Sequence, residues 1–256
     1  MIRIIARKEF SEIVRDGRFM WTAALMVLLL LTAMLAGWQR HGSYMATQAA
    51  AQGATNAQWL KQGDKNPHTA AHYGNYAFKP LGPLAFFDNG VTNYTGTTVF
   101  MEAHKQNFAI ASPAADTSAV RRFGELNGAM ILQVLMPLLI IFLGFTAFAG
   151  ERESGTIRQV MSMGISRASL LGGKALGLAA AVLIVVVPCV IIGAAFIAMT
   201  DLPVVGEGLV TRIALLTVAY LAYGGIFLFL TLAVSACSRS PRAALIVLVG
   251  FWAFTA

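Results

Sequence analysis

Two of the four histidines in this sequence have the spacing of a metal-binding pair. His68 and His72 are four residues apart, which places both imidazoles on one face of a helix. Pro67 precedes them, no HExxH sequence is present, and no carboxylate stands nearby as a third ligand. Structural hydrogen bonding is therefore the favoured interpretation of the pair. Metal binding is the alternative, and we expect the chain to hold no metal.

The segment 151–167 combines charged residues with signals that start and stop a helix. Thr156-x-x-Gln159 matches a capping box, and Gly164 suits the left-handed residue just past a helix end. These signals predict a two-turn helix over 157–163, with Ile157, Val160 and Met161 on one face. Ser166 can cap the next helix. Such a short capped helix is either a docking element for a cytosolic partner or a merely structural loop.

Other chemistry is hard to assemble from these residues. The only Gly-Lys pair, Gly173-Lys174, has Ala168 where a phosphate-binding P-loop requires glycine and Ala175 where it requires serine or threonine. No nucleophile–base pair and no metal triad can be identified in the sequence. We therefore expect a chain that is not itself an enzyme and does not bind ATP by that route.

The composition is that of a membrane protein. Of the 256 residues, 57% are hydrophobic and 12% are charged, and the mean hydropathy is +0.67. A soluble domain usually has about 25% charged residues, so an ordinary soluble enzyme and a disordered chain are both excluded. The net charge is +7, but the placement of the basic residues has a membrane explanation, so we expect no nucleic-acid partner.

Four uncharged runs are long enough to cross the ~30 Å hydrocarbon core of a bilayer. They are 19–38, 128–150, 175–200 and 213–237. A fifth apolar run, 243–256, would reach only about 21 Å as a helix. We interpret it as a truncated span of a longer chain, with a short re-entrant C-terminus as the alternative. The sequence thus predicts an all-α polytopic membrane protein with five visible transmembrane helices and a small extracytoplasmic domain.

The basic residues predict the orientation. Segments 1–18, 151–174 and 238–242 hold 11 Lys and Arg in 47 residues, whereas 39–127 and 201–212 hold 8 in 101. Because cytoplasmic loops are enriched in Lys and Arg, the N-terminus is expected to be cytoplasmic.

The segments outside the spans are also expected to be ordered. Residues 1–18 form either an amphipathic helix in the headgroup layer or a plain extension of the first span. Loop 39–127 is expected to contain a helix at 44–61, an aromatic-rich ordered loop at 66–88 and a helix at 116–127 that leads into the second span.

Few polar groups lie inside the predicted spans. Gln133 either lines a pathway or makes an interhelical hydrogen bond. Gly173-x-x-x-Gly177 permits a close approach between helices. No acid or base lies in the middle of a span, which argues against transport driven by protons or sodium ions through buried carboxylates.

Several motifs resemble one transporter family. Glu151-Arg152-Glu153-Ser154-Gly155-Thr156, followed by Ile165-Ser166-Arg167 and Gly173-Lys174, is similar to the cytoplasmic loop of type-2 ABC exporter permeases. Ala6-Arg7-Lys8-Glu9-Phe10 before the first span fits the same family. His72-Tyr73-Gly74 and Arg122-Phe123-Gly124-Glu125-Leu126 resemble patterns of a subgroup that has a large first extracytoplasmic loop. The resemblance covers nearly the whole chain.

This resemblance implies the membrane subunit of an ATP-driven exporter in a bacterial inner membrane. Its partners would be a cytosolic ABC ATPase, a second permease half in a homo- or heterodimer, and the lipid bilayer. ATP and magnesium would bind to the ATPase, leaving this chain without a cofactor. The residues expected to couple to the ATPase are Glu151, Arg152, Glu153, Gly155, Thr156, Ile157, Arg158, Val160 and Met161. The alternative is a non-transporting membrane sensor or scaffold whose long loop binds a ligand.

Overall fold

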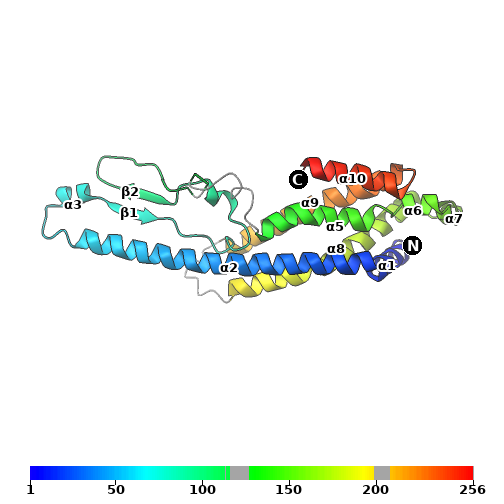
Figure 1. Cartoon of the computed structure of the whole chain (residues 1–256), viewed down its shortest axis with the longest axis horizontal. Helices are drawn as coiled ribbons and strands as arrows, with labels where there is room; N and C mark the ends of the chain where they lie inside the picture. Colours follow the sequence, from blue (N-terminus) through cyan, green and yellow to red (C-terminus); the bar gives the residue numbers. More distant parts are fainter. Residues whose placement is uncertain (113, 116–126, 199–207, 256) are drawn as a thin grey trace. The chain divides into compact units, whose positions relative to one another are not determined.

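The computed structural model describes residues 1–112, 114–115, 127–198 and 208–255 (Figure 1). Within them the chain forms two compact units. The span unit contains residues 1–32, 129–198 and 208–255, and the loop unit contains 33–112, 114–115 and 127–128. The predicted helix at 116–127 and most of the predicted loop 201–212 lie outside the described residues.

The described residues include four helical segments that are long and apolar enough to cross a membrane. They are α2 (Gly17–Leu60), the segment Gly128–Glu153, α8 (Arg167–Ala198) and α9 (Leu209–Cys237). A shorter apolar helix, α10 (Pro241–Thr255), follows. The predicted fold class, an all-α polytopic membrane protein, is confirmed.

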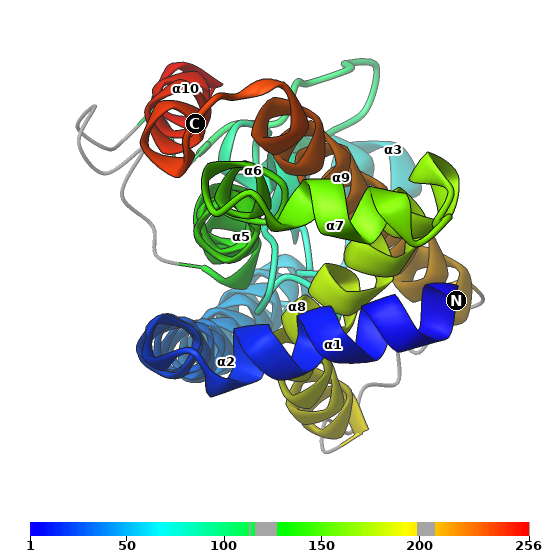
Figure 2. The ribbon, with the colours of Figure 1, turned by 90° about the vertical axis from the view of Figure 1, so that its right-hand side faces the viewer.

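The first helix, α1 (Ile2–Arg15), is separate from α2 rather than an extension of it. Asp16 has an extended backbone, and its side chain accepts a hydrogen bond from the backbone N–H of Arg18 at 2.9 Å. Asp16 therefore stops one helix and caps the next. In Figure 2, α1 is seen lengthwise and α5 is seen end-on, so α1 lies across the direction of this span.

α2 continues well past the predicted span 19–38. Its 44 residues correspond to a length of about 66 Å. The Ala- and Gln-rich segment 44–61 has high helix propensity, and no residue before it stops the helix. The apolar run ends at residue 38, but the helix continues to Leu60.

The predicted span 128–150 is interrupted. α5 (Gly128–Gly144) ends before α6 (Ala149–Glu153) begins. The buried hydroxyl of Ser235 on α9 accepts hydrogen bonds from the backbone N–H groups of Phe148 (3.0 Å) and Ala149 (3.1 Å). It donates to the carbonyl of Phe145 at 2.8 Å. The break is stable in an apolar setting because a neighbouring helix satisfies the freed backbone groups.

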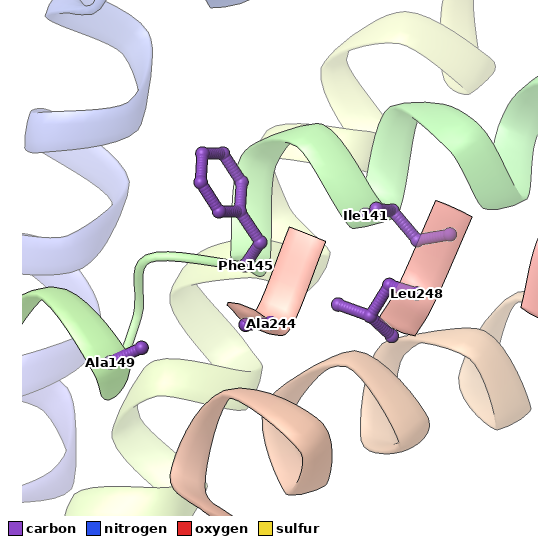
Figure 3. Close-up of a cluster of buried hydrophobic side chains, with 5 residues drawn as sticks. All are labelled: Ile141, Phe145, Ala149, Ala244 and Leu248. Carbon is purple, nitrogen blue, oxygen red and sulfur yellow. The ribbon is translucent and has the colours of Figure 1, made fainter. Parts of the chain in front are cut away.

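A small apolar core joins α10 to the interrupted segment. Its buried side chains, drawn in Figure 3, are Ile141, Phe145, Ala149, Ala244 and Leu248. Trp252 on α10 also donates its indole N–H to the carbonyl of Val134 at 2.8 Å. Thus α10 packs against α5 and α6, immediately before the segment that follows α6.

The loop unit contains a short sheet that the sequence analysis did not predict. α3 (Pro67–Tyr73) leads into β1 (Asn75–Phe78), which pairs antiparallel with β2 (Thr98–Met101), and η1 (Gly90–Asn93) lies between the strands. On the part of α2 that belongs to the loop unit, the Gln52 side chain donates to the carbonyl of Tyr76 at 3.1 Å and accepts from the N–H of Phe78 at 3.1 Å. The predicted ordered loop 66–88 is thus partly regular structure held by the Gln-rich helix.

Candidate coupling site

The helix expected at 157–163 is present as α7 (Thr156–Ser162). Gly155 occupies the N-cap with a positive φ of 76°, so the predicted capping role of Thr156 is wrong. The Thr156 hydroxyl instead donates to the carbonyl of Glu151 at 3.3 Å. The roles of the residues after the helix are confirmed: Gly164 is left-handed (φ 77°), and Ser166 accepts a hydrogen bond from the N–H of Ser169 at 3.1 Å.

The two sides of α7 differ in exposure. Ile157, Val160 and Met161 are half-buried in the chain itself. Arg158 and Gln159 are exposed, and so is Met163 just after the helix, at 67%. Because part of its apolar side is already covered, α7 presents mainly its polar side and Met163 to a partner.

A buried ion cluster connects the start of this loop to two other helices. The Lys174 ammonium, on α8, lies 2.9 Å from Glu9 Oε2 on α1 and 2.9 Å from Glu151 Oε1 on α6. The Lys174 side chain is only 2% exposed. Lys8 lies further away, 3.5 Å from the same Glu151 oxygen, and its side chain is 54% exposed. We call Lys174, Glu9 and Glu151 the Lys174 cluster.

The charges of the cluster compensate for one another. Burial raises the pKa of the Glu9 carboxyl above its ordinary value, although the nearby Lys174 ammonium opposes this rise. A buried lysine is tolerated only when carboxylates compensate for its lost hydration, and Lys174 has two. The two ion pairs of Lys174 therefore link α8 to α1 through Glu9 and to α6 through Glu151.

Two glycines let α1 come close enough to form the cluster. A Cβ on Gly173 would lie 2.6 Å from Ile5 Cβ, and one on Gly177 would lie 2.7 Å from Glu9 Cβ. The close helix approach predicted from Gly173-x-x-x-Gly177 is confirmed, with α1 as the neighbour. Because Lys174 follows Gly173 directly, the same close approach brings the Glu9 carboxyl to the ammonium.

Arg152 provides a further connection. Its guanidinium donates from Nη1 to the carbonyl of Ser238 at 2.7 Å, which links α6 to the C-terminal end of α9.

A cavity of about 540 Å³ lies beside the Lys174 cluster, and its lining includes Lys8, Glu151, Val160 and Met163. α1 and α7 thus border the same cavity.

The other predicted site residues lie elsewhere. The Gln133 side chain is exposed and forms no hydrogen bond within the described part of the chain, whereas its carbonyl accepts from the Tyr223 hydroxyl at 2.7 Å. Its two suggested roles, pathway lining and interhelical bonding, stay predictions. His68 and His72 belong to α3 in the loop unit.

Residues 3–256 match the profile of a family described as "ABC-2 family transporter protein". The chain belongs to the ABC-2 transporter family. A search of curated proteins found no match. Family membership confirms the resemblance to type-2 ABC permeases, while the large-loop subgroup stays a prediction. The chain is an integral membrane permease of an ABC transporter, a transport component that is not itself catalytic.

The sequence of this ABC-2 permease does not by itself identify Glu9 and Lys174 as members of the site. One signal was available. Glu9 lies four residues after Ile5 and four before Ile13, on the apolar side of α1, where an acid is out of place. A buried acid on a helix face requires a basic partner, but the sequence does not indicate which of its 19 Lys and Arg supplies it.

Proposed function

We propose that this ABC-2 permease is the membrane half of an exporter driven by a separate cytosolic ABC ATPase. Two permease halves would work with two ATPase subunits, which would bind ATP and magnesium. The family implies association with an ABC ATPase. The sequence adds that the Gly173-Lys174 pair lacks the flanking residues of a P-loop. The direction of transport is inferred from the resemblance of the 151–174 segment to exporter permeases.

The proposed orientation places the N-terminus and α7 in the cytoplasm of a bacterial cell, with the loop unit outside. It is supported by the 11 basic residues in the 47 residues of segments 1–18, 151–174 and 238–242. The Lys174 cluster would then lie at the cytoplasmic edge of the inner membrane. Its charges suit that depth better than the hydrocarbon core.

The observation that carries the proposed coupling is the contact of Lys174 with both Glu9 and Glu151 at 2.9 Å. Glu151 lies five residues before the start of α7, and the Thr156 hydroxyl bonds to its carbonyl. A force applied to α7 by an ATPase would therefore reach α8 through Lys174 and α1 through Glu9. Arg152 would carry the same movement to the end of α9.

The contact surface follows from the exposure of α7. Arg158, Gln159 and Met163 would touch the ATPase, together with the exposed Glu153. Ile157, Val160 and Met161 would mainly hold α7 against the permease, because they are half-buried there. This division modifies the expectation that Ile157, Val160 and Met161 couple to the ATPase by direct contact.

The experiment is co-purification of the ATPase with the permease from detergent. The double substitution Arg158→Glu and Met163→Asp is expected to remove most of the bound ATPase, because the few hot-spot residues of an interface each cost about 2 kcal/mol or more when lost. The matched control is Lys61→Glu, an exposed charge reversal in the loop unit, which is expected to leave binding unchanged. Undiminished recovery of the ATPase with the double variant would contradict the proposed contact.

A further inference from the structure

Three of the four histidines gather at one place in the loop unit. His68 and His72 lie on α3, and His104 lies just after β2 (Figure 1 labels both elements). The sequence analysis considered only the first two, because His104 is 32 residues further along the chain. The described structure thus brings a third histidine next to the pair, which the sequence did not indicate.

The geometry suits a small cation. The Nε2 atoms of His68 and His72 are 3.1 Å apart, and one ligand nitrogen from each of the three rings lies within 4.8 Å of the others. Tetrahedral zinc, with Zn–N bonds of about 2.0–2.1 Å, separates its ligand nitrogens by roughly 3.3 Å. The three nitrogens are thus close to the separations that one shared ion requires, and all three side chains are exposed.

Backbone contacts join the segments that carry the three histidines. The N–H of Ala103 donates to the carbonyl of Ala71 at 3.2 Å, which joins the His104 segment to α3. His104 has a φ of 64°, which is uncommon for a residue other than glycine and orients its side chain away from a regular strand. Gly74 ends α3 with a φ of 71°, and a Cβ there would lie 2.2 Å from the Phe100 ring of β2.

Burial of the side chains does not explain why the three histidines lie together. All three histidines are exposed, so burial of apolar area does not bring them together. A single hydrogen bond between His68 and His72 would account for two of the rings but not for His104. A shared cation uses all three rings.

We propose that His68, His72 and His104 bind one divalent transition-metal ion of the zinc type. Imidazole nitrogens suit Zn²⁺, and three histidines leave a fourth position for water or for a ligand. The ion would tie the segment after β2 to α3 and so make the loop unit more rigid. This site does not depend on the proposed coupling to an ATPase, because none of its residues belongs to the span unit.

The test is zinc binding by the full chain, purified in detergent with an affinity tag that contains no histidine. After chelator treatment and removal of the chelator, Zn²⁺ is titrated in competition with a chromophoric indicator. The parent chain is expected to bind one equivalent at neutral pH, and His104→Gln is expected to weaken binding by about 100-fold. Binding is also expected to weaken at acid pH, because protonated imidazole cannot coordinate.

The matched control is Lys105→Gln, which changes the exposed neighbour of His104 and is expected to bind zinc like the parent. Co²⁺ added in place of zinc is expected to give the visible absorption of a four-coordinate ion in the parent and not in His104→Gln. Gel filtration and circular dichroism establish that each variant is folded. Equal zinc affinity of the parent and the folded His104→Gln variant would overturn the proposal, as would failure of the parent to bind one equivalent.

Discussion

At the scale of single residues, Lys174 does the most to organise the span unit. Its ammonium is buried between two carboxylates from different helices, each 2.9 Å away. From the sequence, Lys174 is one of the basic residues of the 151–174 segment and belongs to a Gly-Lys pair that lacks the flanking residues of a P-loop. Its partners are 165 and 23 residues away along the chain, a separation at which no spacing rule applies.

Replacing Lys174 with methionine is expected to destabilise the chain by about 3–5 kcal/mol, since it removes the nearest counter-charge of the buried Glu9 carboxylate and leaves Glu151 with the more distant Lys8. Lys8→Met is the matched control, because Lys8 approaches the same Glu151 oxygen at 3.5 Å from a largely exposed position. It is expected to cost less than about 1 kcal/mol. The measurement is the unfolding free energy of each variant in detergent, and equal losses for the two lysines would show that burial of Lys174 is not decisive.

At the scale of elements, α1 can pack closely against α8 because Gly173 and Gly177 carry no side chains. The sequence predicted the amphipathic α1 and the glycine spacing separately, from local patterns. It did not predict that these two features meet. The break between α5 and α6 could not be predicted either, because residues 128–150 form one uncharged, mostly apolar run and the compensating Ser235 lies on α9.

Gly177→Ala is expected to push α1 away from α8, since the added Cβ would lie 2.7 Å from Glu9 Cβ and 2.8 Å from the carbonyl oxygen of Ala6. Overpacking of this kind costs about 1–3 kcal/mol. Gly172→Ala is the control, because its Cβ would meet only Ile2 Cδ1, at 3.9 Å. Both changes gain similar helix propensity. Hydrogen exchange of the α1 amides is expected to speed up in Gly177→Ala alone, and unchanged exchange would refute the close packing.

At the scale of the whole molecule, the fold class and the four spans were predictable because apolar length is a strong local signal. The family could also be predicted, since the motif from Glu151 to Thr156 is contiguous. Sites formed by residues that are distant in the sequence could not be predicted. Both the Lys174 cluster and the three-histidine site combine side chains from separate elements, and only the fold brings them together. These sites nevertheless carry the functional proposals.

The central claim is that the Lys174 cluster passes movement between α7 and the other helices of the permease. Glu9→Gln tests it, because this substitution removes the α1 charge while the pair formed by Lys174 and Glu151 still holds α6 and α8. Glu12→Gln is the control, since the Glu12 side chain is 59% exposed and pairs only with Lys8 among the ion pairs of the described residues.

The decisive measurement is the permease-stimulated rate of ATP hydrolysis in proteoliposomes that contain permease and ATPase. With Glu9→Gln, the ATPase is expected to bind as it does to the parent, but stimulation is expected to fall by about fivefold or more, the range of a typical coupling free energy. Glu12→Gln is expected to stimulate like the parent. Full stimulation by Glu9→Gln would contradict the account.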